Sequence, residues 1–101
     1  MFLEIAQIEV KPGEEAAFEA RVAEAIDLFR QAAGCLGVDL MRSVEKPGRY
    51  RLMVRWRTLE NHTVDFRGSP LYQRWRALAS PHFAAPAEVE HCVAAIAPAS
   101  F

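Results

Sequence analysis

Hydrophobic side chains alternate with other residues at period two in four segments of the chain. Residues 2–10 alternate in part and carry apolar groups on both sides, as in a strand partly covered on both faces. Residues 36–40 follow the same period, and residues 50–57 follow it most strictly, because arginine or methionine separates their apolar positions. A shorter alternation in residues 88–93 predicts the last strand.

Helical spacing fills the two long gaps between these strands. In the first gap a helix can end at Gly34, and its apolar stripe consists of Phe18, Val22, Ile26 and Phe29. The second gap predicts a helix in two pieces: one begins near Thr58 and ends at Gly68, and the other begins at Ser69 and Pro70. The element order is βαββαβ, which predicts an α+β protein with a ferredoxin-like antiparallel sheet.

Size and charge narrow this picture. The 101 residues suit one domain, 1–101, with a single core. The formal net charge is -1, with 12 basic and 13 acidic side chains, so nothing favours nucleic acid or an anionic membrane as a partner. The longest apolar stretches fall short of the roughly 18 residues that suggest a membrane span. Cys35 and Cys92 lack metal-site spacing, so we expect free, buried thiols in a reducing cytoplasm.

Three longer motifs carry a family resemblance that covers most of the chain. They are VKPGEEAAFE near the start, RYRLMVRW on the third strand and HTVDFRGSPLYQRW after it. In this order and spacing they resemble the antibiotic biosynthesis monooxygenase family. The resemblance implies a ferredoxin-like sheet whose helix-free face packs on that of a second copy. The result would be a homodimer, a dimeric α/β barrel, with a pocket in each monomer between sheet and helices.

The same resemblance implies an activity. The family includes oxidoreductases that add oxygen to polycyclic aromatic quinols or anthrones without metal, flavin or haem. Such an enzyme must bind a flat aromatic molecule, help to remove a proton and stabilise the resulting oxyanion. The sequence contains no GxGxxG, GxxxxGK[ST] or HExxH motif. We therefore expect a monooxygenase that uses no cofactor and binds a hydrophobic aromatic small molecule.

Strand residues 50–57 place three arginines on the side opposite the apolar one. The side chains of Arg51, Arg55 and Arg57 have long apolar stems that can pack across a dimer interface while their guanidinium groups meet carboxylates. A solvated polar face explains Arg51 and Arg57 equally well.

Two residues are candidates for catalysis. His62 shares a helical face with Leu59 and Phe66, and its unperturbed pKa of about 6.5 would let it accept a phenolic proton near neutral pH. A structural histidine with satisfied hydrogen bonds is the competing interpretation. Arg76 could stabilise an oxyanion, as a basic residue on this helix does in some relatives, or it could simply be exposed beside the inward stripe.

The expected substrate-binding residues are mainly aromatic. Trp56 ends the third strand on its apolar side, so it could form one wall of a flat pocket or merely fill the core. We expect Phe66, Tyr72 and Trp75 of the broken helix to complete this pocket. His91 lies on one side of the last strand, from which it could reach the pocket.

Metal and haem are not expected. The three histidines lack the close spacing of a local metal motif, so we predict no metal site. One branch of the family degrades haem with an asparagine, a tryptophan and a histidine. The corresponding positions here hold Ala6, Phe66 and Arg76, which disfavours that activity.

Two other functions compete with the oxygenase. The first is a non-catalytic module that holds a hydrophobic small molecule in the same pocket. The second follows from the element order, which RNA-recognition modules share. Those modules carry glycines and stacking aromatic residues on the third strand, whereas RYRLMVRW lacks glycine and places Tyr50 and Trp56 on the core side. The RNA-binding interpretation is therefore disfavoured.

Overall fold

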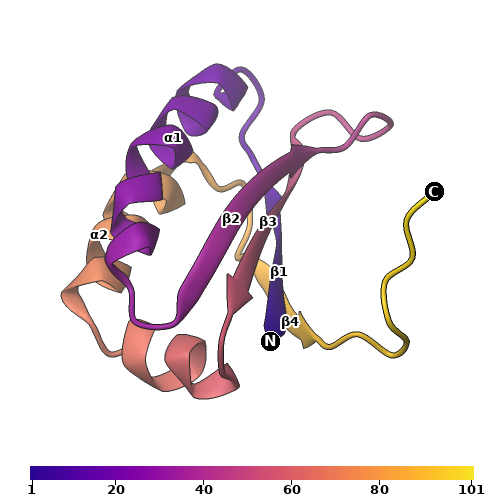
Figure 1. Cartoon of the computed structure of the whole chain (residues 1–101). Coiled ribbons are helices and arrows are strands. Elements are labelled where there is room, and N and C mark those ends of the chain that lie inside the picture. Colours follow the sequence, from indigo (N-terminus) through magenta and orange to yellow (C-terminus); the bar gives the residue numbers. More distant parts are fainter.

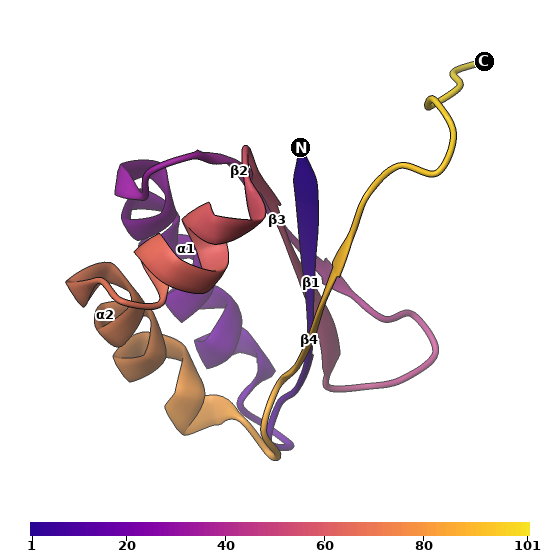
Figure 2. The ribbon, with the colours of Figure 1, turned by 90° about the horizontal axis from the view of Figure 1, so that it is seen from below.

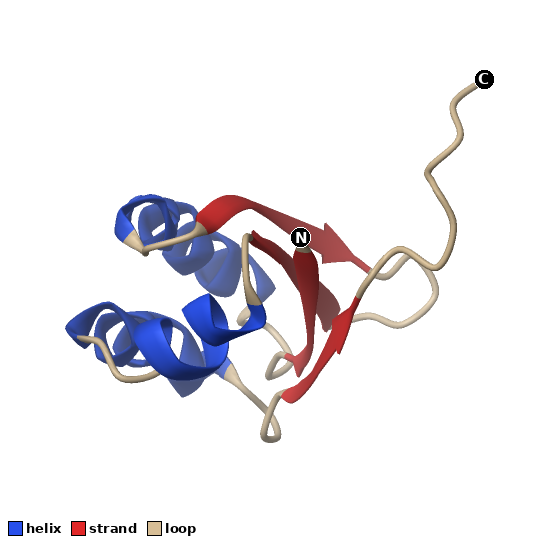
Figure 3. Cartoon of the chain, turned by 60° about the horizontal axis from the view of Figure 1, so that its bottom comes forward, coloured by secondary structure: helices blue, strands red, loops and turns tan.

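The computed structural model describes residues 1–101 as two helices packed on one face of a four-stranded antiparallel sheet (Figure 1, Figure 3). The strands are β1 (Phe2–Glu9), β2 (Cys35–Arg42), β3 (Arg49–Trp56) and β4 (Glu88–Cys92), and the main helices are α1 (Glu15–Gln31) and α2 (Pro70–Ala79). The strand order is β2-β3-β1-β4. The predicted α+β class and ferredoxin-like element order are confirmed.

The sheet register decides which side chains of β1 meet the helices. Glu4, Ala6 and Ile8 are buried on the helix side, while the residues between them face the other side of the sheet. Glu4 lies opposite Val54 of β3 and, across its other edge, opposite His91 of β4. Glu4 is thus an acidic residue in an otherwise apolar inward row.

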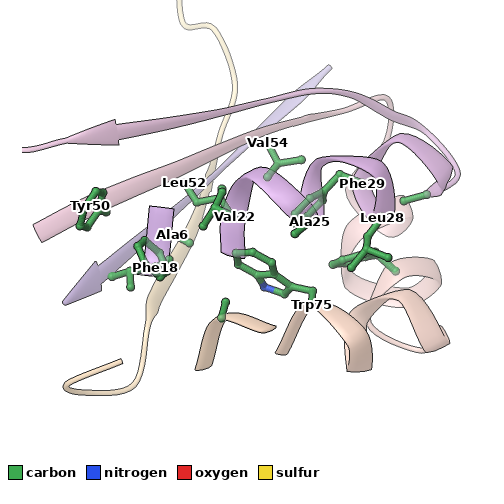
Figure 4. Close-up of a cluster of buried hydrophobic side chains, with 14 of the residues drawn as sticks. Ala6, Phe18, Val22, Ala25, Leu28, Phe29, Tyr50, Leu52, Val54 and Trp75 are labelled. Carbon is green, nitrogen blue, oxygen red and sulfur yellow. The ribbon is translucent and has the colours of Figure 1, made fainter. Parts of the chain in front are cut away.

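The helices and the sheet form two layers (Figure 2), and six of the sixteen residues in the hydrophobic core between them are aromatic. Phe18 and Phe29 of α1 are almost fully buried, and Trp75 of α2 reaches toward them and the sheet (Figure 4). The rings of Phe29 and Trp75 meet edge to face with centroids 5.2 Å apart. The helical stripes predicted from the sequence therefore face the sheet, with Ile26 only half-buried.

The predicted break in the second helix is confirmed, but its first piece has an unexpected geometry. Residues Asn61–Phe66 form a wide π-helical turn, η1, in which the backbone N–H of Arg67 donates to the carbonyl of His62. A new helix begins at Ser69, whose hydroxyl accepts from the backbone N–H of Tyr72. Pro70 then takes the first helical position, as predicted.

Gly34 positions this turn against the end of α1. It has a φ of +75°, and a Cβ at this position would collide with the side chain of Asn61. Asn61 is itself held by Thr58, whose backbone N–H and hydroxyl both donate to its side-chain oxygen. The close approach fixes where η1 starts and hence where His62 points.

The helix-free sheet face carries the predicted arginines. Arg51 donates to Gln7 at 2.9 Å, and Arg55 pairs with Asp39 at 2.8 Å, while Arg57 is exposed beyond the strand. Residues 93–101 follow β4 and extend away from the sheet and helices (Figure 1). Neither main helix combines the length and apolar character needed to cross a bilayer.

Candidate active site

A cavity of about 270 Å³ opens between the helices and the β1–β4 side of the sheet. Most of its wall is apolar, and its aromatic members are Phe29, Phe66, Tyr72, Trp75 and Phe83. Two acid–base side chains, Glu4 and His62, interrupt this apolar wall. Such a combination of apolar lining and a few polar groups is typical of small-molecule sites.

Glu4 is the more unusual of the two, because only 6% of its surface is exposed. Its Oε1 atom accepts a hydrogen bond of 3.0 Å from the indole N–H of Trp56. Burial raises the pKa of the Glu4 carboxyl above its usual value, against the opposing effects of the Trp56 hydrogen bond and the Arg67 charge. The neutral acid is therefore favoured more strongly here than in water.

His62 projects from η1 and lies flat against the Trp56 indole, with centroids 5.3 Å apart and planes tilted by 16°. Its Nε2 lies 3.3 Å from Oε1 of Glu4, and its Nδ1 lies 2.7 Å from Nε2 of His91. Burial lowers the pKa of His62 to about 4, and the charge of Arg67 and the neighbouring His91 act in the same direction. His62 is thus a neutral imidazole at physiological pH.

His91 completes the line of polar groups. It is half-buried on β4, directly across from Glu4, and burial together with the Arg67 charge lowers its pKa. Because both histidines are neutral, one of the two facing nitrogens must carry a proton and donate the hydrogen bond, and the other must accept that bond. Trp56, Glu4, His62 and His91 therefore form one continuous line of side chains, in which hydrogen bonds join Trp56 to Glu4 and His62 to His91, and a 3.3 Å contact joins Glu4 to His62.

Two arginines flank the opening of the cavity. Arg67 follows η1, and its guanidinium carbon lies 5.8 Å from the centre of the Tyr72 ring. Arg76 projects from α2, and both arginines are exposed while contributing to the cavity wall. They place positive charge beside a cavity in which burial disfavours the charged forms of Glu4 and His62.

A model of the antibiotic biosynthesis monooxygenase family matches residues 1–85. The chain belongs to this family. A protein from Bordetella bronchiseptica, provisionally assigned to the same monooxygenases, is 52% identical, and its crystal structure superposes with a TM-score of 0.92 over 94% of this chain and 97% of that one. YczJ of Bacillus subtilis, which is uncharacterized, is 36% identical over 90% of this chain and 96% of its own length.

A more distant structure has the same fold. SnoaB from Streptomyces nogalater, a cofactor-independent oxygenase, is 16% identical with a TM-score of 0.79, and the match covers 95% of this chain and 94% of that one. At this identity the likeness shows the fold alone. Monooxygenase activity in general is what the family membership supports for the chain.

The cavity brings together most of the residues expected from the sequence. His62, Phe66, Tyr72, Trp75 and Arg76 all contribute to the cavity wall. Trp56 does not, because it is fully buried behind His62, and His91 connects to the cavity only through His62.

Glu4 and Arg67 were missed by the sequence analysis. Glu4 had a detectable signal, since it falls on the same alternation as Ala6 and Ile8 and is therefore an acid on the core side of a strand. Arg67 had none. No group of three or more His, Cys, Asp or Glu side chains is arranged to hold a metal ion.

Proposed function

We propose that the protein is a cofactor-independent monooxygenase that acts on an aromatic quinol- or anthrone-like small molecule. The observation that carries this proposal is the buried Glu4–His62 pair on the wall of an aromatic-lined cavity. The family supports oxygenation in general, and SnoaB shows that this fold can host an oxygenase without a cofactor.

The reaction needs little from the protein beyond binding and proton transfer. Loss of a phenolic or benzylic proton makes the aromatic substrate electron-rich enough to reduce dioxygen directly. One oxygen atom then enters the substrate, and the other leaves as water with two substrate hydrogens. The buried pair would assist removal of the proton, because a base in a partly desolvated pocket is well placed to act on a bound acid.

The arginines at the opening have a separate role in this proposal. When the substrate becomes an anion, positive charge nearby stabilises it, and Arg76 and Arg67 are the cations of the cavity wall. Arg76 is the residue expected from the sequence, and the charge of Arg67 acts on the buried pair, because it lowers the pKa of both Glu4 and His62.

The cavity volume limits the substrate. Small-molecule pockets usually measure about 300 to 1,000 Å³, and this one measures about 270 Å³. The volume favours quinols with one ring or two fused rings, and an anthrone, with three fused rings, counts among the wider ligands. A wider ligand would require the side chains of α2 to move.

We also propose that two copies pair through the helix-free face of the sheet. Leu3, Ile5 and Met53 are only half-buried there, beside the Arg51–Gln7 and Arg55–Asp39 contacts. An apolar centre with a charged rim is typical of stable interfaces. Sedimentation at the monomer mass over a wide concentration range would refute this pairing.

A non-catalytic binding module remains the second candidate function. Its supporting observation is that both ring nitrogens of His62 already have partners, as in a purely structural histidine. In that case the cavity would hold an aromatic molecule without consuming oxygen.

Oxygen uptake separates the two candidates. Purified, chelator-treated protein is given naphthoquinols, anthrones and catechols, with His62→Ala as the test variant and His82→Ala as the control. His82 lies outside the cavity, where it contacts Glu14. We expect uptake in the wild type and in His82→Ala and a loss of about 100-fold in His62→Ala. Ligand binding without uptake for any compound would instead support the binding module.

A further inference from the structure

The two oxygen atoms of the Glu4 carboxyl have different surroundings. Oε1 receives the Trp56 indole N–H and lies next to Nε2 of His62. Oε2 makes no hydrogen bond within the protein, although Glu4 belongs to the cavity wall. The free oxygen is therefore the one positioned to meet a bound molecule.

Both ring nitrogens of His62, in contrast, already have partners within the protein. Nε2 lies against Glu4 and Nδ1 against His91, so this ring has no free nitrogen to offer a substrate. His91 uses Nε2 for that contact, and its Nδ1 has no partner in the protein. Because His91 is half-buried on the edge strand β4, it is the member of the line that solvent can reach.

We propose that Glu4, His62 and His91 form a proton relay, in which Oε2 of Glu4 takes the substrate proton and His91 releases a proton to solvent. This inference rests on the oxygenase function proposed above. It assigns first contact with the substrate to Glu4, and it makes His62 and His91 relay residues that act through Glu4.

The proton movements balance along the line. At rest, Oε1 of Glu4 carries a proton and donates to Nε2 of His62, and Nδ1–H of His62 donates to Nε2 of His91. When the substrate hydroxyl gives its proton to Oε2, the Oε1 proton passes to His62. The Nδ1 proton of His62 then passes to His91, which loses its own Nδ1 proton to water. The substrate loses one proton, solvent gains one, and the relay keeps its charge.

The relay avoids a cost that a single buried base would incur. An isolated carboxylate or imidazolium is unfavourable at this burial, which is why the pKa of Glu4 is raised and that of His62 is lowered. In the relay neither ion has to form. The nearby titratable and charged groups are Arg67, which favours the carboxylate and disfavours imidazolium, and Cys35, whose thiol pKa is raised mainly by burial.

A first test needs no substrate. Protein with ¹⁵N-labelled histidine is followed by NMR across pH, and His91→Phe and His82→Phe are compared with the wild type. We expect His62 and His91 to stay neutral at pH 6 with matched tautomers, and His91→Phe to change the Nδ1 signal of His62. His82→Phe should leave that signal unchanged. Independent titration of His62 and His91 near pH 6.5, or no response to His91→Phe, would overturn the relay.

A second test uses turnover. Glu4→Gln preserves an acceptor for Trp56 but cannot pass a proton, so uptake should fall by about 100-fold. His91→Phe should lower kcat by about tenfold with little change in KM, because His91 is not part of the cavity wall. Uptake by His91→Ala should recover when imidazole is added, a response that a structural role would not produce. Folding of each variant is checked by circular dichroism.

The outcomes separate the two proposals. A wild type without uptake but with coupled histidine tautomers would refute the oxygenase and support the relay as a feature of the site. An active wild type whose His91 variants match it in kcat and pH profile would refute the relay and leave the oxygenase standing.

Discussion

Each end of β3 buries an aromatic side chain whose polar atom donates a hydrogen bond to a glutamate, but the two glutamates differ in exposure. At one end Trp56 donates from its indole to Glu4 at 3.0 Å, and at the other Tyr50 donates from its hydroxyl to Glu19 at 2.5 Å. Both aromatic side chains are almost fully buried. The glutamates differ, since 44% of the Glu19 side chain is exposed and only 8% of the Glu4 side chain is.

This difference in exposure gives the two glutamates different roles: Glu19 holds an aromatic side chain in place, and Glu4 is a candidate for acid–base function. Glu19 lies on the outer side of α1 and also approaches Arg42, so its charge is solvated and its contact mainly fixes Tyr50. Glu4 is enclosed with two histidines beside a cavity, where charge is costly and the polar side chains contact one another. The same aromatic–glutamate pair therefore becomes a candidate for acid–base function only where solvent is excluded.

Truncating either aromatic residue should have the largest effect on stability. Trp56→Ala and Tyr50→Ala should each lower the free energy of unfolding by about 3–5 kcal/mol in denaturant titrations. Only Trp56→Ala removes the surface on which His62 lies, so only this variant should raise the pKa of His62 toward 6.5, as measured by NMR. An equal rise in Tyr50→Ala would contradict the separation of the two ends.

The effect of pH on stability should come next in size. His62 should destabilise the protein as the pH falls, and Tyr50 should destabilise it as the pH rises. The pKa of His62 is about 4 in the folded state and 6.5 in water, so its contribution is complete above pH 6.5. As pH falls toward 4, unfolded protein binds the proton first, and stability drops by on the order of 3 kcal/mol. Glu4 acts in the opposite sense. Its pKa is raised in the folded state, so its contribution to stability is complete below pH 4.5 and is lost as the pH rises above that value.

At the other end, burial raises the pKa of Tyr50 from 10 to about 12, with Glu19 adding to the effect. Its contribution is complete below pH 10 and is lost as pH rises toward 12. Because solvent screens the exposed Glu19 partner, the loss should be about 1 to 2 kcal/mol. Urea titrations of the wild type, His62→Gln and Tyr50→Phe isolate the two groups. His62→Gln should reduce the pH dependence of stability on the acid side only, and Tyr50→Phe should reduce it on the alkaline side only. The reverse pattern would contradict the assignment of these two groups.

Replacing each glutamate by alanine should have the smallest effects on stability, and it compares the two ends of β3 most directly. Glu4→Ala leaves the Trp56 N–H buried without an acceptor, which should cost about 1–3 kcal/mol. Glu19→Ala should cost less than about 1 kcal/mol, because water can replace an exposed partner of Tyr50. Thermal or chemical unfolding of both variants at pH 7 measures the difference. Equal losses would mean that burial does not distinguish these glutamates.

Much of the fold could be predicted because it depends on local periodicity. The strict alternation of residues 50–57 and the Ser69–Pro70 helix start both appear where expected, since solvent exclusion and capping act within a few residues. The geometry of η1 was not predictable, because a π-helical turn depends on how Asn61 packs against Gly34. That contact joins segments distant in the sequence.

The candidate site divides along the same line. His62, Phe66 and Trp75 could be assigned to the inward face of one broken helix from spacing alone. Glu4 and His91 come from strands at opposite ends of the chain, and only the β1–β4 register sets them side by side. The sequence thus determined the elements and their buried faces, because burial follows periodicity. The tertiary structure decided the Trp56–Glu4–His62–His91 line, because hydrogen bonds between side chains require the register and burial that only the assembled sheet and helices provide.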